Sequence, residues 1–221
     1  MIQNTDEQMA EAAVTTLSKN GKRLWPRYGS LVQQITRKLD GANGPAVIAC
    51  AGMTRGEGAS TVATNIAIAF SIINEQPVLL INGNERPTSA ERPLGVRPET
   101  GLEQIVSDTE QMPDVIVPTL IRNLDYLGCG LKNRDTFSPF LMSRFPAVLE
   151  ALKNRYRVVI VDLPAMDKPS NNGALINATD GVVLVMQPGH VKAAKAKRIQ
   201  QSLERSGANV LGVVMNRSEE N

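Results

Sequence analysis

Short runs that are apolar at every position constrain the fold more than any other feature of the sequence. The clearest runs from Val158 to Val161, and similar runs cover 46–50, 78–81, 182–186 and 210–215. A strand with one solvent-exposed face alternates between apolar and polar residues. Unbroken apolar runs therefore indicate strands that are covered on both faces. Such strands are typical of parallel sheets that lie between two layers of helices.

Segments with helical periodicity separate these runs. After Pro26, an apolar stripe predicts a helix, and further helices are predicted over 60–74, near 102–106, over 139–156, near Ala174 and over 191–205. A further strand is predicted over 124–127. Alternation of strands and helices indicates right-handed parallel crossovers. The predicted fold class is therefore α/β, with a doubly wound, mostly parallel sheet.

The stripe of the first helix consists of Leu31, Val32, Ile35 and Leu39. In the last helix we expect Ala194, Ile199 and Leu203 to face the core. The cations of that helix are Lys192, Lys195, Lys197, Arg198 and Arg205. They form either a solvated face or a docking patch for an acidic lipid or partner tail.

A length of 221 residues suits one generous domain or a domain with an appendage. We expect a mobile N-terminal arm over 1–27, because this segment is polar and lacks sustained periodicity. A single domain is predicted over 28–217, followed by a short tail over 218–221. The proline-rich loop 86–100 is predicted to be a surface excursion.

Composition excludes several classes of protein. The formal net charge is only +2, so nucleic-acid binding is not expected. The two cysteines, Cys50 and Cys129, cannot build a disulfide framework, and Cys50 is interpreted as a buried small hydrophobe. His190 is the only histidine, which excludes a multi-histidine metal site, and it is expected in a loop. We expect no secretory signal and no membrane span, and hence a cytoplasmic chain.

A glycine loop follows the first buried run. Residues 53–61 connect a strand to a helix, which is the order of a P-loop that cradles phosphates with backbone N–H groups. The motif is incomplete, because Met53 stands at its first glycine and Ala59 at its lysine, and only Gly58 and Ser60 match. The alternative interpretation is a tight turn in which glycine avoids a clash. In doubly wound sheets ligands bind beyond the carboxyl ends of the strands, here 51–61, 82–88, 162–168 and 187–190.

The order of several landmarks makes a resemblance specific. They are Gly56-Glu57-Gly58-x-Ser60-Thr61, Leu94-Gly95-Val96, Gly101-Leu102, 124–127, 158–164, 180–185 and 207–217. From about residue 28 to 217 the chain resembles the bacterial tyrosine kinases (BY-kinases) of capsule and exopolysaccharide operons. These are P-loop ATPases related to the Min and Par proteins. The resemblance implies a P-loop NTPase-like fold of the Min/Par type.

The resemblance also assigns the positions of the site. In the family the loop lysine falls at Ala59, two acids fall at Asn82 and Asn84, and a third acid falls at Asp162. Asn is nearly isosteric with Asp but neutral, so it holds Mg²⁺ less firmly and cannot act as a base. We therefore expect no active catalytic residue and no bound cofactor, with ATP and Mg²⁺ used only if the site still functions.

What remains is expected to be vestigial. The phosphate loop keeps Arg55, Gly56, Gly58, Ser60 and Thr61, of which Arg55 is a candidate substitute for the lost lysine. Ser60 and Asp162 are the candidates for a residual metal site, and Asp162 alternatively accepts hydrogen bonds in a cap or turn.

Two further departures from the family concern the ends of the domain. The family's tyrosine cluster, which is autophosphorylated, is absent from the ending Arg217-Ser218-Glu219-Glu220-Asn221. The family's Glu/Arg motif for ring assembly falls near residues 26–31, where the match is poor. Both departures agree with a pseudokinase.

The resemblance implies a scaffold or regulator of exopolysaccharide or capsule biosynthesis or export. Its implied partner is a membrane polysaccharide co-polymerase or the cytoplasmic tail of one, with a possible homo-oligomer and no nucleic acid. It would be peripheral at the inner membrane through that partner. Two alternatives stay open: an ATP-binding tyrosine kinase or ATPase that works through Arg55 and Asp162, and a Min/Par-like positioning factor.

Overall fold

The protein is described by a computed structural model over residues 21–39, 44–84, 90–107, 112–130, 139–167 and 172–217. Residues 1–20 of the arm predicted over 1–27, the tail over 218–221 and residues 86–89 of the predicted loop lie outside these ranges. Residues 21–27 of that arm belong to a helix and are not an unstructured arm. Within them, no helix has both the length and the apolar character that a membrane span requires.

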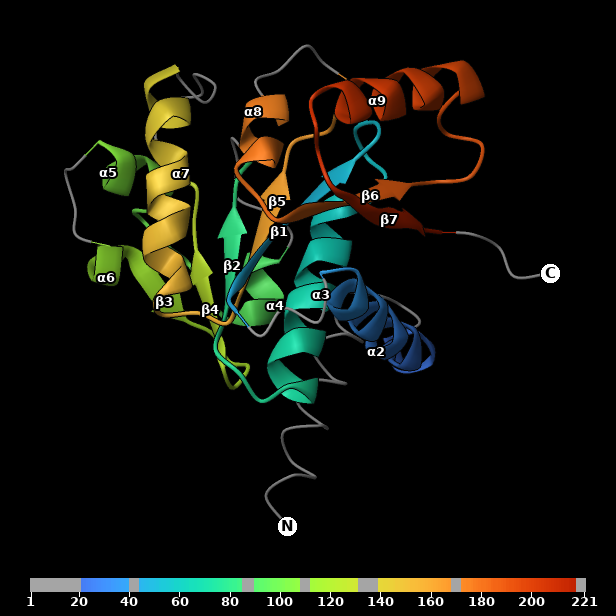
Figure 1. Ribbon diagram of the computed structural model, residues 1–221. Helices are drawn as coiled ribbons and strands as arrows, with labels where there is room; N and C mark the ends of the chain where they lie inside the picture. Colours follow the sequence, from blue (N-terminus) through green and yellow to red (C-terminus); the bar gives the residue numbers. More distant parts are fainter. Residues whose placement is uncertain are drawn as a thin grey trace.

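A seven-stranded sheet forms the centre of the described chain, in the order β3-β4-β2-β5-β1-β6-β7 (Figure 1). The strands are β1 (Ala46–Gly52), β2 (Val78–Asn82), β3 (Ile116–Pro118), β4 (Leu124–Leu127), β5 (Val158–Leu163), β6 (Gly181–Met186) and β7 (Val210–Met215). Every neighbouring pair is parallel except β3 and β4, which are antiparallel. The predicted doubly wound, mostly parallel sheet is confirmed.

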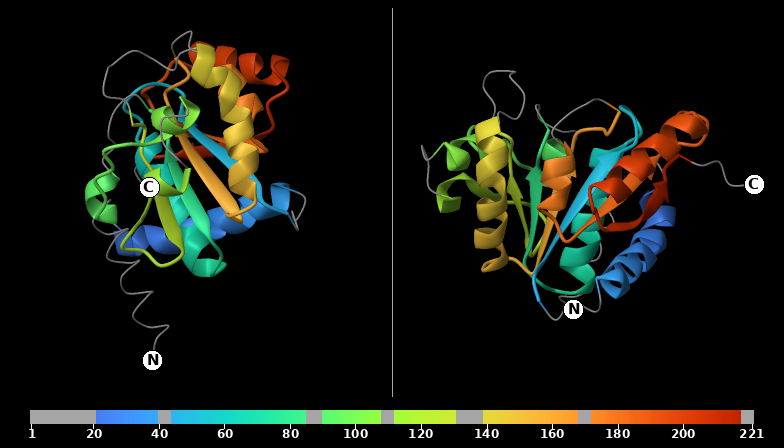
Figure 2. Two further views of the ribbon diagram at one scale, coloured as in Figure 1. Left: turned by 90° about the vertical axis from the view of Figure 1, so that its left-hand side faces the viewer. Right: turned by 45° about the horizontal axis from the view of Figure 1, so that its top comes forward.

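Helices cover both faces of this sheet (Figures 1 and 2). One face packs against α2 (Gly21–Lys38), α3 (Ala59–Ile73) and α4 (Glu91–Leu94). The other packs against α5 (Leu102–Val106), α6 (Met112–Val115), α7 (Pro139–Lys153), α8 (Asn172–Asn177) and α9 (Ala193–Arg205). Burial on both faces explains the unbroken apolar runs, since β1, β2 and β5 are buried at every position.

The first helix begins earlier than predicted. It starts at Gly21 and continues through Pro26, so the prediction of a helix only after Pro26 was wrong at its start. Proline removes one helical N–H donor but does not always end a helix. Tyr28, Val32 and Ile35 are buried against α3 and the sheet, and this packing holds the helix in place.

The core side of α9 also differs from the prediction. Ile199 and Leu203 are buried as expected, but Ala194 is exposed, and Ala196 packs against the core in its place. Positions 196, 199 and 203 follow the three- and four-residue spacing of one helical stripe. The predicted surface excursion over 86–100 contains a short helix, α4, whose Leu94 is buried in the core.

Candidate functional site

The candidate site begins at the loop that joins β1 to α3. Gly56 and Gly58 have φ angles of 90° and 83°, in the left-handed region that favours glycine. At Gly58 a Cβ atom would also collide with the side-chain amide of Asn216. Glycine at 58 is thus required both by the backbone and by the close approach of the end of β7.

Three successive carbonyl groups of this loop contact side chains from the ends of β6 and β7. The pairs are Arg55 O with His190 Nε2 (3.3 Å), Gly56 O with Arg217 Nη1 (3.1 Å) and Glu57 O with Asn216 Nδ2 (2.8 Å). His190 lies in a loop and is exposed, as predicted. We call these three side chains the carbonyl braces. They fix the path of the loop from the outside.

A buried carboxylate holds the same loop from within. Glu57 is only 1% exposed, and its Oε2 accepts the backbone N–H of Thr54 at 2.6 Å. Its Oε1 accepts the backbone N–H of Gln187 at 3.3 Å. Glu57 therefore joins the loop to the segment after β6. The sequence placed Glu57 in a glycine motif but gave it no role, because its partner at 187 is remote in the chain.

The positions expected to carry acids lie together at the carboxyl ends of β2 and β5. Asn82 and Asp162 are direct neighbours in the parallel register. Asn82 Oδ1 accepts the backbone N–H of Asn84 at 2.9 Å, and Asn84 Nδ2 donates to the backbone oxygen of Asp162 at 3.2 Å. Ser60, in the first turn of α3, hydrogen-bonds the Asp162 side chain. The structure thus brings together Ser60, Asn82, Asn84 and Asp162.

Asp162 is the one ionisable side chain of this group. It is 4% exposed, and burial raises the pKa of its carboxyl to about 7, while hydrogen bonds from Ser60 and Asn84 favour the charged form and offset part of the rise. Its Oδ1 atom has no hydrogen-bond partner in the part of the chain that the structure describes. The negative charge also contributes to the raised pKa of the Cys50 thiol, whose first cause is burial. Cys50 is a fully buried member of the core, as predicted.

The other loop positions supply little charge. Ala59 begins α3, and its side chain packs against the core. Arg55 is exposed, and Ser60 and Thr61 are half-buried. Among the described residues, no three His, Cys, Asp or Glu side chains gather as a metal cluster would require. The donor set for Mg²⁺ is therefore one buried carboxylate, one hydroxyl and two neutral amides, a poor match to this hard cation.

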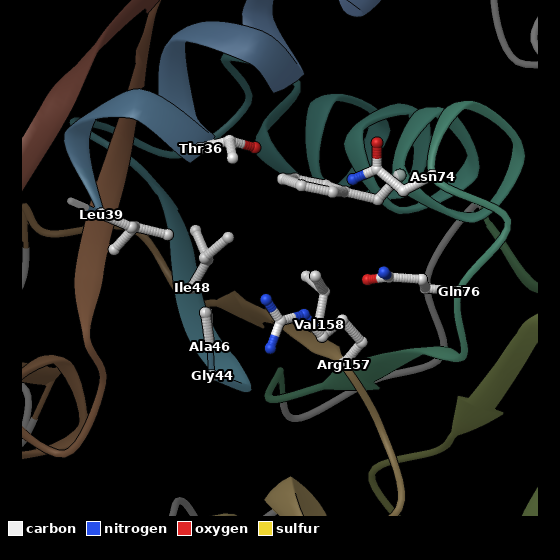
Figure 3. A pocket seen from close by; sticks show the side chains of 10 residues that line it. Thr36, Leu39, Gly44, Ala46, Ile48, Asn74, Gln76, Arg157 and Val158 are labelled. Atoms are coloured by element: carbon white, nitrogen blue, oxygen red, sulfur yellow. The ribbon is translucent and has the colours of Figure 1, made fainter. Parts of the chain in front are cut away.

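A separate cavity of about 250 Å³ lies at the opposite ends of the strands (Figure 3). Its lining includes Ile48, Phe70 and Val158 as apolar surface, with Gln76 and Arg157 as polar groups. Val158 is the first residue of β5, whereas the loop and Asp162 lie beyond the carboxyl ends. This cavity is not part of the candidate site.

Comparison by sequence gives a consistent set of relatives. The tyrosine-protein kinase CpsD of Streptococcus agalactiae is 24% identical over 174 residues, covering 79% of this chain and 75% of the relative. CpsD of Streptococcus pneumoniae is 27% identical over 172 residues, covering 77% and 75%. The tyrosine-protein kinase YwqD of Bacillus subtilis is 28% identical over 163 residues, covering 73% and 68%. Models of known protein families give no match.

Solved structures share the fold. The chimerical protein CapA2B2 aligns with a TM-score of 0.79 and 20% identity, covering 95% of this chain and 91% of that protein. The kinase domain of the Escherichia coli tyrosine kinase ETK has a TM-score of 0.69 and 23% identity, covering 81% and 72%. The cell division ATPase MinD of Pyrococcus furiosus has a TM-score of 0.65 and 21% identity, covering 80% and 73%. The expected P-loop NTPase-like fold of the Min type is confirmed.

Proposed function

Because the chain is a homologue of the bacterial tyrosine kinases in the BY-kinase family, we propose that it is a catalytically degenerate member of that family. It acts as a scaffold or regulator in bacterial exopolysaccharide or capsule biosynthesis or export. In this role it docks on a membrane polysaccharide co-polymerase, and the conserved architecture supplies a surface without phosphoryl transfer.

The observation that carries the proposal is the charge of the assembled site. Phosphoryl transfer depends on cations and carboxylates held around the phosphates. Here Ala59 provides no cation, and Asn82 and Asn84 are neutral. The Asn82 side chain accepts a hydrogen bond from the Asn84 backbone, and the Asn84 side chain donates one to the backbone oxygen of Asp162. Losing one electrostatic donor typically slows catalysis by about 10²–10³. Three such losses in one site leave no useful turnover.

Hydrogen bonds from Glu57 and from two of the carbonyl braces support the same proposal. A nucleotide normally orders a phosphate loop by occupying its N–H groups. In this chain Glu57, Asn216 and Arg217 hold the loop with hydrogen bonds of 2.6, 2.8 and 3.1 Å from within the protein. The loop thus has a structural role that needs no ligand.

The pathway and partner rest on the relatives. CpsD and YwqD are named tyrosine-protein kinases, and EpsB of Ralstonia solanacearum is named a putative tyrosine-protein kinase. CapA2B2 is a chimerical protein with a TM-score of 0.79 to this chain. These relatives favour an exopolysaccharide or capsule context. We place the protein in the cytoplasm, peripheral at the inner membrane through its partner.

Thermal unfolding of the purified protein tests the proposal. Mg-ATP and Mg-ADP at millimolar concentration are expected to leave the melting temperature almost unchanged. A ligand present at 100 times its dissociation constant would stabilise the folded state by about 2.7 kcal/mol, which is easily detected. Clear stabilisation at tens of micromolar would instead favour an active ATPase or kinase.

One observation favours that alternative. The Oδ1 atom of Asp162 is buried and has no partner among the described residues, so it is available to a cation. Arg55 is exposed in the loop and is the candidate for neutralising phosphate charge in the absence of a lysine. In this second function the protein is an ATP-binding kinase or ATPase of the same pathway. Phosphotyrosine detection and a Mg-ATP hydrolysis assay separate it from the scaffold.

A further inference from the structure

The last strand forms an edge of the sheet that no other described strand covers. β7 follows β6 at the end of the strand order, and Figures 1 and 2 show it on the outer side of the molecule. The opposite edge, β3, is only three residues long and contains Pro118. Short strands and proline protect an edge against pairing with another chain. β7 has six residues and contains neither proline nor a charged residue.

The backbone direction along β7 shows which groups face outward. The backbone N–H of Asn216 donates to Met186 O in β6 at 2.8 Å. Successive residues in a strand direct their N–H and C=O groups to alternate sides. Val214 therefore faces β6, whereas Val213 and Met215 direct their backbone groups away from the sheet. Unpaired groups of this kind are a template for another strand.

The side chains at the same two positions are also exposed. Val213 is 47% exposed and Met215 is 56% exposed, and both belong to the few large apolar side chains with exposed surface in the described chain. Val214 packs against the core cluster that includes α2 and α3, so its neighbours point to the face that carries α9. Free backbone groups and apolar side chains thus occur together at 213 and 215.

The charge around this edge indicates the chemistry of its partner. Between residues 192 and 217 the chain has six cations and one carboxylate, Glu204. The cations are Lys192, Lys195, Lys197, Arg198, Arg205 and Arg217, all of them exposed. A second copy paired strand to strand would bring two such segments together, and like charges would oppose the contact. An acidic segment would be attracted.

We infer that β7 is a docking edge for an extended, acidic segment of a partner protein, which adds an eighth strand beside Val213 and Met215. Backbone hydrogen bonds would supply affinity, and alternate apolar side chains would pack on the two exposed ones. The acidic residues between them would point to the face that carries α2 and α3, so the cations of 192–217 would attract the segment through its net charge and not through direct pairs. This inference does not depend on the state of the phosphate loop.

Fluorescence anisotropy with a labelled octapeptide of alternating Glu and Val tests the inference on the full chain. Saturable binding is expected, together with slower amide hydrogen exchange at Val213 and Met215. The Val213→Glu variant is expected to weaken binding at least tenfold. An octapeptide of alternating Lys and Val has the same strand propensity and opposite charge, and it is expected to bind at least tenfold more weakly.

Ile73→Glu is the matched control, because Ile73 is 43% exposed but lies on a helix away from β7. This variant is expected to bind like the unmodified chain. No binding of the acidic peptide, equal binding of the two peptides, or equal weakening by both variants would overturn the inference. So would a dimer in analytical ultracentrifugation that Val213→Glu dissociates, since the edge would then belong to a second copy. Unchanged melting temperatures of both variants verify that they fold.

Discussion

Asp162 determines how the folded state responds to pH. Its pKa is about 7 in the folded protein and about 3.9 in an unfolded chain, so the charged form is disfavoured by folding. The contribution of protonated Asp162 to the free energy of unfolding is fully present below about pH 4, and it is lost as the pH rises through 7. This loss is at most about 1.4 kcal/mol per pH unit between those limits.

The Asp162→Asn variant is expected to remove this dependence. Chemical unfolding of both proteins between pH 5 and pH 8 measures the difference in the free energy of unfolding. The unmodified protein should lose stability relative to the variant as the pH increases. A difference that stays constant over this range would show that Asp162 is already ionised in the folded protein at pH 5.

Glu57 is the second residue whose removal has a predictable cost. Glu57→Ala leaves the backbone N–H groups of Thr54 and Gln187 without their acceptor. An unsatisfied buried donor costs about 1–3 kcal/mol. We expect a lower free energy of unfolding and faster hydrogen exchange in residues 53–58. Glu99→Ala, at an exposed position, is the control and should change neither quantity.

Among the elements, the sequence predicted those that carry a strong pattern. β1, β2 and β5 are buried at every position, and their apolar runs made them recognisable. α4, α6 and β3 have four, four and three residues, which is too short for any period to develop. The predicted start of α2 was wrong because the burial of Tyr28 outweighs the local effect of Pro26 on the helix.

For the site, the sequence predicted which strand ends lie together, but it did not predict the hydrogen bonds that connect them. Parallel strands place Asn82 beside Asp162, which follows from the strand assignment alone. The contact between Asn216 and Glu57 spans 159 positions and depends on the depth to which β7 docks. No local pattern encodes such a pair. Sequence separation is therefore the physical reason why the braces were missed.

The strand ends also define a repair experiment. The triple variant Ala59→Lys, Asn82→Asp, Asn84→Asp is expected to bind Mg-nucleotide measurably, because Ser60 and Asp162 already lie with these positions. Isothermal titration calorimetry is the measurement. Lysine alone should restore less, and the acids alone least, because they add negative charge without a cation. A folded triple variant without any binding would show that the pocket no longer admits a nucleotide.

At the scale of the whole molecule, attachment to a membrane is the property to measure. The proposed docking on a membrane co-polymerase predicts that the protein binds membranes through that partner. In sedimentation assays the protein should pellet with vesicles that contain a polysaccharide co-polymerase and stay in solution with protein-free anionic liposomes. Equal recovery with both would make the cations of α9 a direct lipid contact. A variant with Lys192, Lys195 and Lys197 changed to Gln would then lose that binding.

The carbonyl braces have a consequence for the order in which the molecule assembles. Arg217 and Asn216 contact Gly56 and Glu57 across 161 and 159 positions of the chain. A ribosome completes β1, the loop and α3 long before it adds these two residues, and domains acquire structure as the chain emerges. The loop of a nascent chain thus lacks two of its ties until the end of β7 has been synthesised. Any ligand or partner that recognises the braced loop consequently recognises only molecules whose last strand has been made and docked.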